Sequence, residues 1–369
     1  MEQSITDAFS ALPETGFPGR LSGEIMRFAQ HDQFFHLAAA KNRRSNCLRE
    51  HFNGRTPRKI FIGQNLDGFD FKLPGCEVVQ LQASFFKDTG EAVRAERRAL
   101  LEDSIVIVTN NDVSRADGGP LYGDFFNRCP STVFATWDWD NHHWLDNSVY
   151  TAAHSDIYAP AHHENLYLLT RYNWATVGPV YCATIQWPRP FLAGHVTTMV
   201  NAERLDEPLG MHVAYTRFVF RNRVASTLNQ HFPKIGFRTH SYHDRTLEDR
   251  LLEWCAYKVH WIIPVLNDVP IRIFDALITG GIPIVPASMQ HLPPVNCISR
   301  EHILFYTPDD IVNPAGIVAR AVEMFNRGGV DKLVERHRYA LEHHHASSRL
   351  RSILASVAEQ YGTVLPLGQ

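Results

Sequence analysis

The segment NDVPIRIFDALITGGIPIVP, residues 267–286, places a carboxylate inside a pattern typical of a buried helix. Its apolar residues recur at helical spacing on one face, at Ile271, Phe274, Leu277 and Ile278. Asp275 lies one position off that stripe, so we expect it at the helix border near the carboxyl edge of a sheet, where open α/β folds bind ligands. A carboxylate there can accept two hydrogen bonds from a vicinal diol such as a ribose. Alternatively, Asp275 pairs with Arg272 or is solvated.

Residues that favour the start and the end of a helix flank the same segment. Asp268 occupies the position expected for an N-cap, and Pro270 is tolerated in a first helical turn. Gly280 and Gly281 can turn the chain into the next strand. Because a helix N-terminus has free N–H groups and partial positive charge, this one can face a sugar or a phosphate.

Three arginines lie within seven residues in YTRFVFRNR, at Arg217, Arg221 and Arg223. A guanidinium group suits phosphate because it donates two hydrogen bonds in a fork. A solvated helix face explains the same pattern equally well. We expect Arg221 or Arg217 to be the first phosphate contact.

The segment TWDWDNHHWLDN, residues 136–147, is the densest polar and aromatic cluster of the chain. Asp138 and Asp140 form a D-x-D pair after a predicted strand, and hard divalent cations prefer carboxylate oxygens. Asp138, Asp140, His142 or His143 can instead act as a general base on a hydroxyl group. A structural alternative is that the tryptophans are partly core and the polar residues cap the following turn.

Two sets of alternating strands and helices must position these residues. The first predicts strands at 59–65, 76–82, 104–111 and 131–140 and a helix at 90–104. The second predicts strands at 210–215, 234–240, 260–266, 282–286 and 303–307 and helices at 222–230, 246–259, 313–327 and 329–358. Such alternation implies parallel pairing and layered α/β sheets. Pro264 inside the strand at 260–266 argues against a regular strand there.

The predicted organisation has four parts. Residues 1–57 form a helical leader, 58–205 a first α/β lobe, 206–345 a second α/β lobe, and 346–369 a C-terminal helix that packs back toward the first lobe. Three consecutive histidines, His343 to His345, point to different helix faces and favour surface positions.

The stretch DALITGGIPIV, residues 275–285, resembles the donor-site motif of GT-B glycosyltransferases. HHHASSRLRSIL, residues 343–354, is similar to the terminal helix of the bacterial spore-coat CgeB-like group within that class. The resemblance implies two Rossmann-like lobes facing a cleft. It also implies sugar transfer from a nucleotide-sugar to a hydroxyl acceptor, in bacterial polysaccharide or surface glycoconjugate synthesis.

The resemblance also implies roles for individual residues. The family pattern is similar to E-x7-E, with Asp275 at the acid that holds the ribose and Asn267 at the acid near the donor sugar. Asn267 departs from the pattern, because an amide replaces the carboxylate. The adjoining donor-binding residues are Asp268, Val269, Pro270 and Arg272, and the three arginines face the diphosphate from the loop after the first strand of the second lobe.

In that arrangement the residues Asp138, Asp140, His142 and His143 face the cleft from the acceptor side, where they act as base or stabilise the leaving group. No metal is required under this scheme. Two alternatives remain: a metal-dependent transferase that uses the D-x-D pair as GT-A enzymes do, and a non-catalytic nucleotide-sugar-binding protein, which the amide of Asn267 keeps open.

Composition narrows the classes of partner. The chain of 369 residues has a net charge of -3 and a sequence pI near 6.7, which gives no general attraction to nucleic acid. Its six cysteines are scattered without CxxC pairs, as in a reducing compartment. Because the sequence shows neither a secretory signal nor a membrane-spanning apolar run, we expect a cytoplasmic protein. The sequence leaves open whether the protein contacts the inner face of the membrane peripherally. It also leaves open whether the acceptor is a glycan, a lipid-linked molecule or a protein, and which oligomeric state the protein has.

No dinucleotide-binding GxGxxG, Walker loop, GxSxG or kinase motif occurs in the sequence. Each of these motifs has a mechanical role that its enzyme class needs. Their absence argues against dehydrogenases, NTPases and hydrolases.

Overall fold

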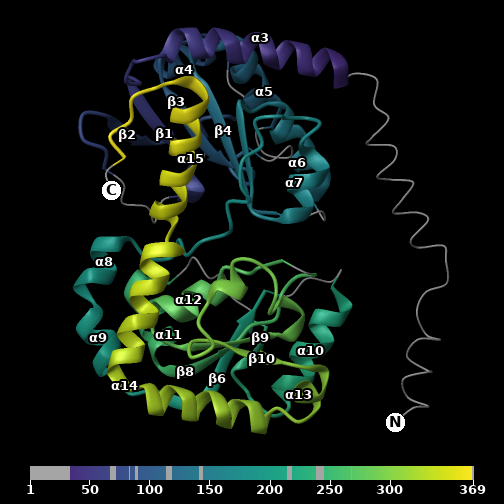
Figure 1. Cartoon of the computed structure of the whole chain (residues 1–369), viewed down its shortest axis with the longest axis vertical. Coiled ribbons are helices and arrows are strands. Elements are labelled where there is room, and N and C mark those ends of the chain that lie inside the picture. Colours follow the sequence, from purple (N-terminus) through teal and green to yellow (C-terminus); the bar gives the residue numbers. More distant parts are fainter. Residues whose placement is uncertain are drawn as a thin grey trace, which may run out of the picture.

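The computed structural model describes residues 34–66, 72–82, 84–87, 90–113, 119–140, 144–213, 218–237, 245–266 and 268–367. Within these residues the chain forms two α/β lobes, which Figure 1 shows one above the other. The predicted fold class is therefore confirmed. Of the predicted leader, residues 1–33 lie outside the described part, and α3 (Phe34–Phe52) is a single helix.

The first lobe contains one parallel sheet in the order β2-β1-β3-β4-β5. Its strands are β1 (Lys59–Ile62), β2 (Glu77–Gln80), β3 (Ile105–Thr109), β4 (Val133–Asp138) and β5 (Ile157–Pro160). Its helices after α3 are α4 (Glu91–Leu101), α5 (Gly119–Arg128), α6 (Leu145–Ala153) and α7 (His163–Leu169). Every residue of β3 and β4 is buried, as expected for parallel strands covered on both faces.

The second lobe repeats this topology with the order β10-β9-β8-β6-β7, also parallel. Its strands are β6 (Leu205–His212), β7 (Ile235–Phe237), β8 (Tyr257–Trp261), β9 (Ile282–Pro286) and β10 (Leu304–Tyr306). Its helices include α8 (Arg189–Gly194), α9 (Val196–Asn201), α10 (Val219–Asn229), α11 (Leu247–Cys255), α12 (Arg272–Ile278), α13 (Pro308–Val312) and α14 (Ala315–His343). In both lobes the first strand lies between the second and the third, which creates a topological switch point beside it.

Two details of the second lobe bear on the sequence prediction. The strand expected at 260–266 is β8, which ends at Trp261, so that Pro264 lies outside the sheet. The boundary at residue 205 stays a prediction, and Trp187, Leu192 and Met199, which precede it, pack in the core of the second lobe. The aromatic-rich stretch before residue 205 has little periodicity. The sequence therefore did not reveal where the chain passes into the second lobe, or the strand β5 of the first lobe.

The chain crosses between the lobes twice, and the two crossings are bonded to each other. The Thr184 N–H donates to the His344 carbonyl at 2.9 Å, and the Ala346 N–H donates to the Thr184 carbonyl at 3.0 Å. The His345 ring donates from Nε2 to the Trp187 carbonyl at 2.9 Å. His344 and His345 are therefore buried between elements, which corrects the predicted surface positions.

After the second crossing, α15 (Ala346–Tyr361) runs up to the first lobe (Figure 1). Its apolar face packs in the core of the first lobe through Leu350, Ile353, Leu354 and Val357. The end of the chain thus belongs to the same core as β1 and β3.

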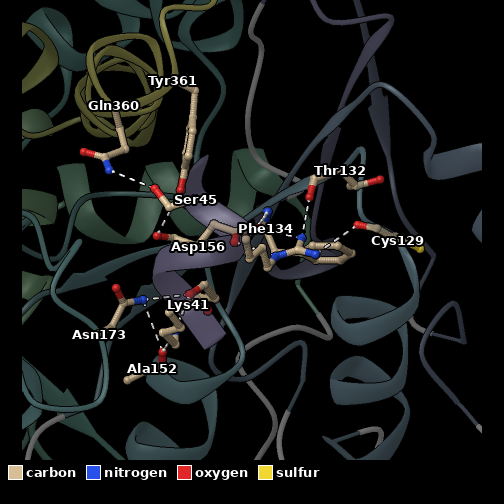
Figure 2. Close-up of polar contacts among 12 residues, drawn as sticks. Lys41, Ser45, Cys129, Thr132, Phe134, Ala152, Asp156, Asn173, Gln360 and Tyr361 are labelled. Carbon is tan, nitrogen blue, oxygen red and sulfur yellow. Dashed lines mark hydrogen bonds and ion pairs between the residues drawn. The ribbon is translucent and has the colours of Figure 1, made fainter. Parts of the chain in front are cut away.

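A buried polar network fixes α3 to the first lobe (Figure 2). Arg44 bonds both oxygens of Asp156 at 2.7 and 3.0 Å, and its Nη2 donates to the Thr132 carbonyl at 2.7 Å. The Lys41 ammonium donates to the Ala152 and Ser155 carbonyls at 2.8 and 2.6 Å. Burial lowers the pKa of Lys41 to about 7. The described part of the leader is therefore an integral part of the first lobe.

Among the described residues, no helix combines the length and the apolar character that crossing a bilayer requires.

Candidate active site

Asp138 ends β4 at the carboxyl edge of the first sheet, but its side chain is fully buried. It accepts hydrogen bonds from the Tyr158 hydroxyl, from Asn165 Nδ2 at 3.2 Å and from the Asp140 N–H at 3.2 Å. Burial raises the pKa of Asp138 to about 6, although hydrogen bonds from Ser148, Tyr158 and the Asp140 backbone oppose the rise. Asp138 therefore bonds the turn after β4 and has no solvent-exposed surface.

Asp140 is held in place by the same network but keeps partial exposure. Asn110 Nδ2 donates to its carboxylate, and Asn165 Nδ2 donates to its carbonyl at 2.8 Å. His142 and His143 lie outside the described residues. Of the four predicted catalytic side chains, Asp140 is thus the one that the described structure leaves within reach of a ligand.

The hydrogen bonds of Asp138 bear on the D-x-D pair as a possible metal site. The Asp138 oxygens already accept three protein donors. Within the described ranges, no group of three His, Cys, Asp or Glu side chains has an arrangement that can hold a metal ion. The roles of Asp138 as a ligand or base stay predictions, and its burial at the strand end leaves Asp140 as the more exposed member of the pair.

At the carboxyl edge of the second sheet, basic groups gather around the end of β6. Arg221 on α10 is 6% exposed and donates from Nη1 to the Val213 carbonyl at 2.6 Å. Arg223 lies on the same helix with an exposed side chain, and Arg217 lies outside the described residues. The two described arginines of this motif thus differ, because Arg221 is buried and Arg223 faces solvent.

His212, the last residue of β6, adds to this basic edge and was not foreseen from the sequence. It is 1% exposed, and its buried ring interacts with the Trp261 backbone. Burial lowers its pKa well below the usual value, and the charges of Arg272 and Arg221 lower it further. A neutral imidazole therefore lies near two guanidinium groups. Its place at a strand end, beside the arginine motif, was the available signal.

Asp268 lies in the loop before α12 and is not its N-cap, because the helix begins at Arg272 after Ile271. Burial raises the pKa of Asp268 to about 7, while the Arg221 charge opposes that rise. Its Oδ1 atom is buried and has no hydrogen-bond partner in the described ranges. Asn267 lies outside them, Val269 is buried and Pro270 is half-buried. The loop thus brings a second carboxylate to the basic edge.

Asp275 lies inside α12 and is 1% exposed, so the expected open position at the helix border is wrong. Gln186 of the first crossing donates from Nε2 to Oδ2, and Oδ1 has no partner among the described residues. Burial raises the pKa of Asp275 to about 7. The crossings cover this helix, since the His344 ring stacks on Phe274 with centroids 4.1 Å apart.

Basic groups fix α12 at its C-terminal end. His337 Nδ1 donates to the Ile278 carbonyl at 2.6 Å, Arg204 Nη2 to the Thr279 carbonyl at 2.7 Å, and Arg336 Nε to the Gly280 carbonyl at 2.9 Å. These are the carbonyls that a helix leaves unpaired, and positive groups are favourable there. The anchored end sets the position of Asp275 and of the loop before it.

A small cavity opens at the switch point between β6 and β8. It is lined by Leu209, Gly210, Met211, Trp254, Trp261, Ile262 and Arg272. Its volume of about 10 Å³ suits about one water molecule.

Cys182 of the first crossing is buried and lies near carboxylates of both lobes. Burial raises the pKa of the Cys182 thiol, and the charges of Asp268, Asp140 and Asp138 raise it further. Its thiol also lies 3.7 Å from the Trp139 carbonyl. The first crossing thus brings Cys182 near acidic groups from the carboxyl edges of both sheets.

No protein-family model and no curated protein matches the chain. Among solved structures it is similar to the α,α-trehalose 6-phosphate synthase of Burkholderia multivorans, with 8% identity, 83% of this chain and 97% of that chain covered, and a TM-score of 0.45. The UDP-forming α,α-trehalose-phosphate synthase of Burkholderia vietnamiensis is 10% identical, with 82% of this chain and 99% of that chain covered and a TM-score of 0.43. A GtfA/B complex is 13% identical, with 73% of this chain and 60% of that chain covered and a TM-score of 0.36. With TM-scores below 0.5, these similarities do not bear on the chemistry of the chain.

Proposed function

We propose that the chain is a GT-B-type glycosyltransferase that moves a sugar from a nucleotide-sugar to an acceptor hydroxyl, in bacterial polysaccharide or surface glycoconjugate synthesis. The observation that carries this proposal is the mixed charge at the carboxyl edge of the second sheet. Arg221 and Arg272 lie there with His212, beside the carboxylates Asp268 and Asp275, each of which has a buried oxygen without a partner within the described residues.

The basic residues at this edge suit the diphosphate of a nucleotide-sugar, and the acidic residues suit its ribose. Guanidinium groups bind a diphosphate, because its oxygens accept forked, charge-assisted hydrogen bonds. The Asp275 carboxylate accepts hydroxyl donors from the ribose. Since the cavity at the switch point has room for about one water molecule, the donor enters after the lobes separate at the crossings.

The first lobe holds the acceptor in this scheme. The acceptor oxygen attacks the anomeric carbon, the bond from that carbon to the phosphate oxygen breaks, and the nucleoside diphosphate leaves with the bonding electrons. Asp140 takes the hydroxyl proton, with His142 and His143 as further candidates. Catalysis then comes from positioning and from Arg221 and Arg272, which stabilise the charge on the departing diphosphate. No metal ion is needed for these steps, and the scattered cysteines suit a cytoplasmic location.

A thermal-shift panel of UDP, GDP, dTDP, ADP and CMP tests the proposal. A nucleotide at about a hundred times its Kd adds about 2.7 kcal/mol to the free energy of unfolding. We expect one base to stabilise the protein clearly, and donor hydrolysis to follow with sugars on that base. Stabilisation without turnover of any donor identifies a non-catalytic binding protein, whereas no stabilisation by any nucleotide contradicts both versions.

A further inference from the structure

The first crossing holds Gln186 between two fixed points. On one side, the Thr184 backbone bonds both His344 and Ala346. On the other side, Trp187 is fully buried, and its indole N–H donates to the Leu247 carbonyl at 3.0 Å. The backbone beside Gln186 is therefore anchored, and its side chain reaches α12 from a defined direction.

Two buried acceptor atoms belong to the contact between Gln186 and Asp275. They are Asp275 Oδ1 and Gln186 Oε1, and neither makes a well-formed hydrogen bond within the described ranges. The Thr184 hydroxyl is a further donor beside the carboxylate, where it favours the charged form of Asp275. Because buried acceptors without donors are costly, this group suits a ligand that supplies O–H donors.

We propose that Gln186 is a positioning residue that holds the Asp275 carboxylate while the donor is absent and yields it to the donor's hydroxyl groups. This inference rests on the proposed function, and it adds the crossing to the donor site. The amide N–H of Gln186 and a ribose O–H are both neutral donors to the same oxygen, so one replaces the other at little cost. The exchange removes the side-chain link between the crossing and α12, which couples donor binding to movement of the lobes.

Replacement of Gln186 by methionine tests the exchange directly, because methionine keeps the length of the side chain without its amide. The nucleotide that stabilises the wild type best is titrated calorimetrically into wild type and Gln186→Met. Gln230→Ala serves as the control, since Gln230 is exposed at the end of α10. We expect the Kd of Gln186→Met to fall by about 3- to 10-fold, because the ligand no longer competes with the amide. The control is expected to match the wild type.

An unchanged or weaker affinity of Gln186→Met overturns the inference and leaves the proposed function intact. No nucleotide binding to the wild type overturns both. If Gln186→Met does not fold, amide hydrogen exchange of the wild type decides. Added nucleotide must then speed exchange at Ile185 and Gln186 while it slows exchange in α12, and slower exchange at both places contradicts the inference.

Discussion

The two lobes share one strand order, yet they treat the carboxylates at their sheet edges differently. In the first lobe, Asp138 accepts bonds from Tyr158, Asn165 and the backbone of Asp140. In the second lobe, Gln186 donates to one oxygen of Asp275 and the Thr184 hydroxyl is a second donor beside the carboxylate, while Oδ1 has no well-formed hydrogen bond among the described residues. Burial raises the pKa of both carboxyls, so burial alone does not distinguish structural from ligand-binding acids.

The difference lies in how completely each carboxylate is satisfied. A satisfied buried acid specifies local structure, because removing it strands several donors. An incompletely satisfied one near arginines is held ready for a ligand that brings its own donors. We therefore expect the acid at the carboxyl edge of the first sheet to contribute to stability, and the acid at the carboxyl edge of the second sheet to contribute to ligand binding.

The largest effect is expected from Asp138→Ala. Loss of the carboxylate strands the Tyr158 hydroxyl and weakens the turn after β4, so the free energy of unfolding should fall by about 2–4 kcal/mol. Urea denaturation measures this change. Nucleotide affinity is expected to stay within about twofold of wild type, and an unchanged stability with lost binding breaks the comparison.

The second effect concerns pH. Because burial raises the pKa of Asp275 from 3.8 to about 7, the folded state binds more protons than the unfolded state between those values. Stability contributed by this group is full below about pH 4 and is lost as the pH rises through about 7. Asp275→Asn should flatten the stability profile over this window by on the order of 1–3 kcal/mol. Parallel wild-type and variant profiles, recorded by thermal unfolding, contradict this assignment.

The third prediction compares two arginines on α10. Arg221→Lys keeps the charge but loses the fork, so nucleotide diphosphate affinity should fall about tenfold. The matched variant Arg223→Lys is expected to change affinity by less than about twofold, because that side chain is exposed. Calorimetric titration measures both, after circular dichroism shows that each variant is folded. Equal losses in the two variants remove the distinction between the buried and exposed arginines.

The smallest effect is expected from metal removal. Since Asp138 is occupied by protein donors, EDTA should leave donor turnover within error of the untreated enzyme. Loss of activity that Mn²⁺ or Mg²⁺ restores supports the metal-dependent alternative instead.

Local patterns predicted much of the fold. The strand at 282–286 was placed correctly, because an apolar run lies between Gly281 and the end of β9. β8 was placed late, since Tyr257 and Val259 followed a helical pattern and were assigned to the helix before it. Periodicity thus identifies helices and strands, but it does not fix the boundary between two that follow each other directly, because the residues there fit both patterns.

The candidate site was less predictable, because its contacts join distant parts of the chain. Gln186 and Asp275 are 89 positions apart, and Asp138 lies 27 positions from Asn165. Whether a carboxylate is open or covered depends on these partners. Sequence periodicity placed Asp275 beside the apolar stripe, but the crossing that buries it has no pattern of its own.

The most direct test titrates the best-stabilising nucleoside diphosphate into the wild type, Asp275→Asn and Asp138→Asn by calorimetry. If the unsatisfied acid of the second lobe binds the ligand, affinity falls about 10- to 100-fold in Asp275→Asn, because a charged acceptor is lost. It stays within about twofold of wild type in Asp138→Asn. Undiminished binding to Asp275→Asn, or the larger loss in Asp138→Asn, contradicts the assignment of the two edges.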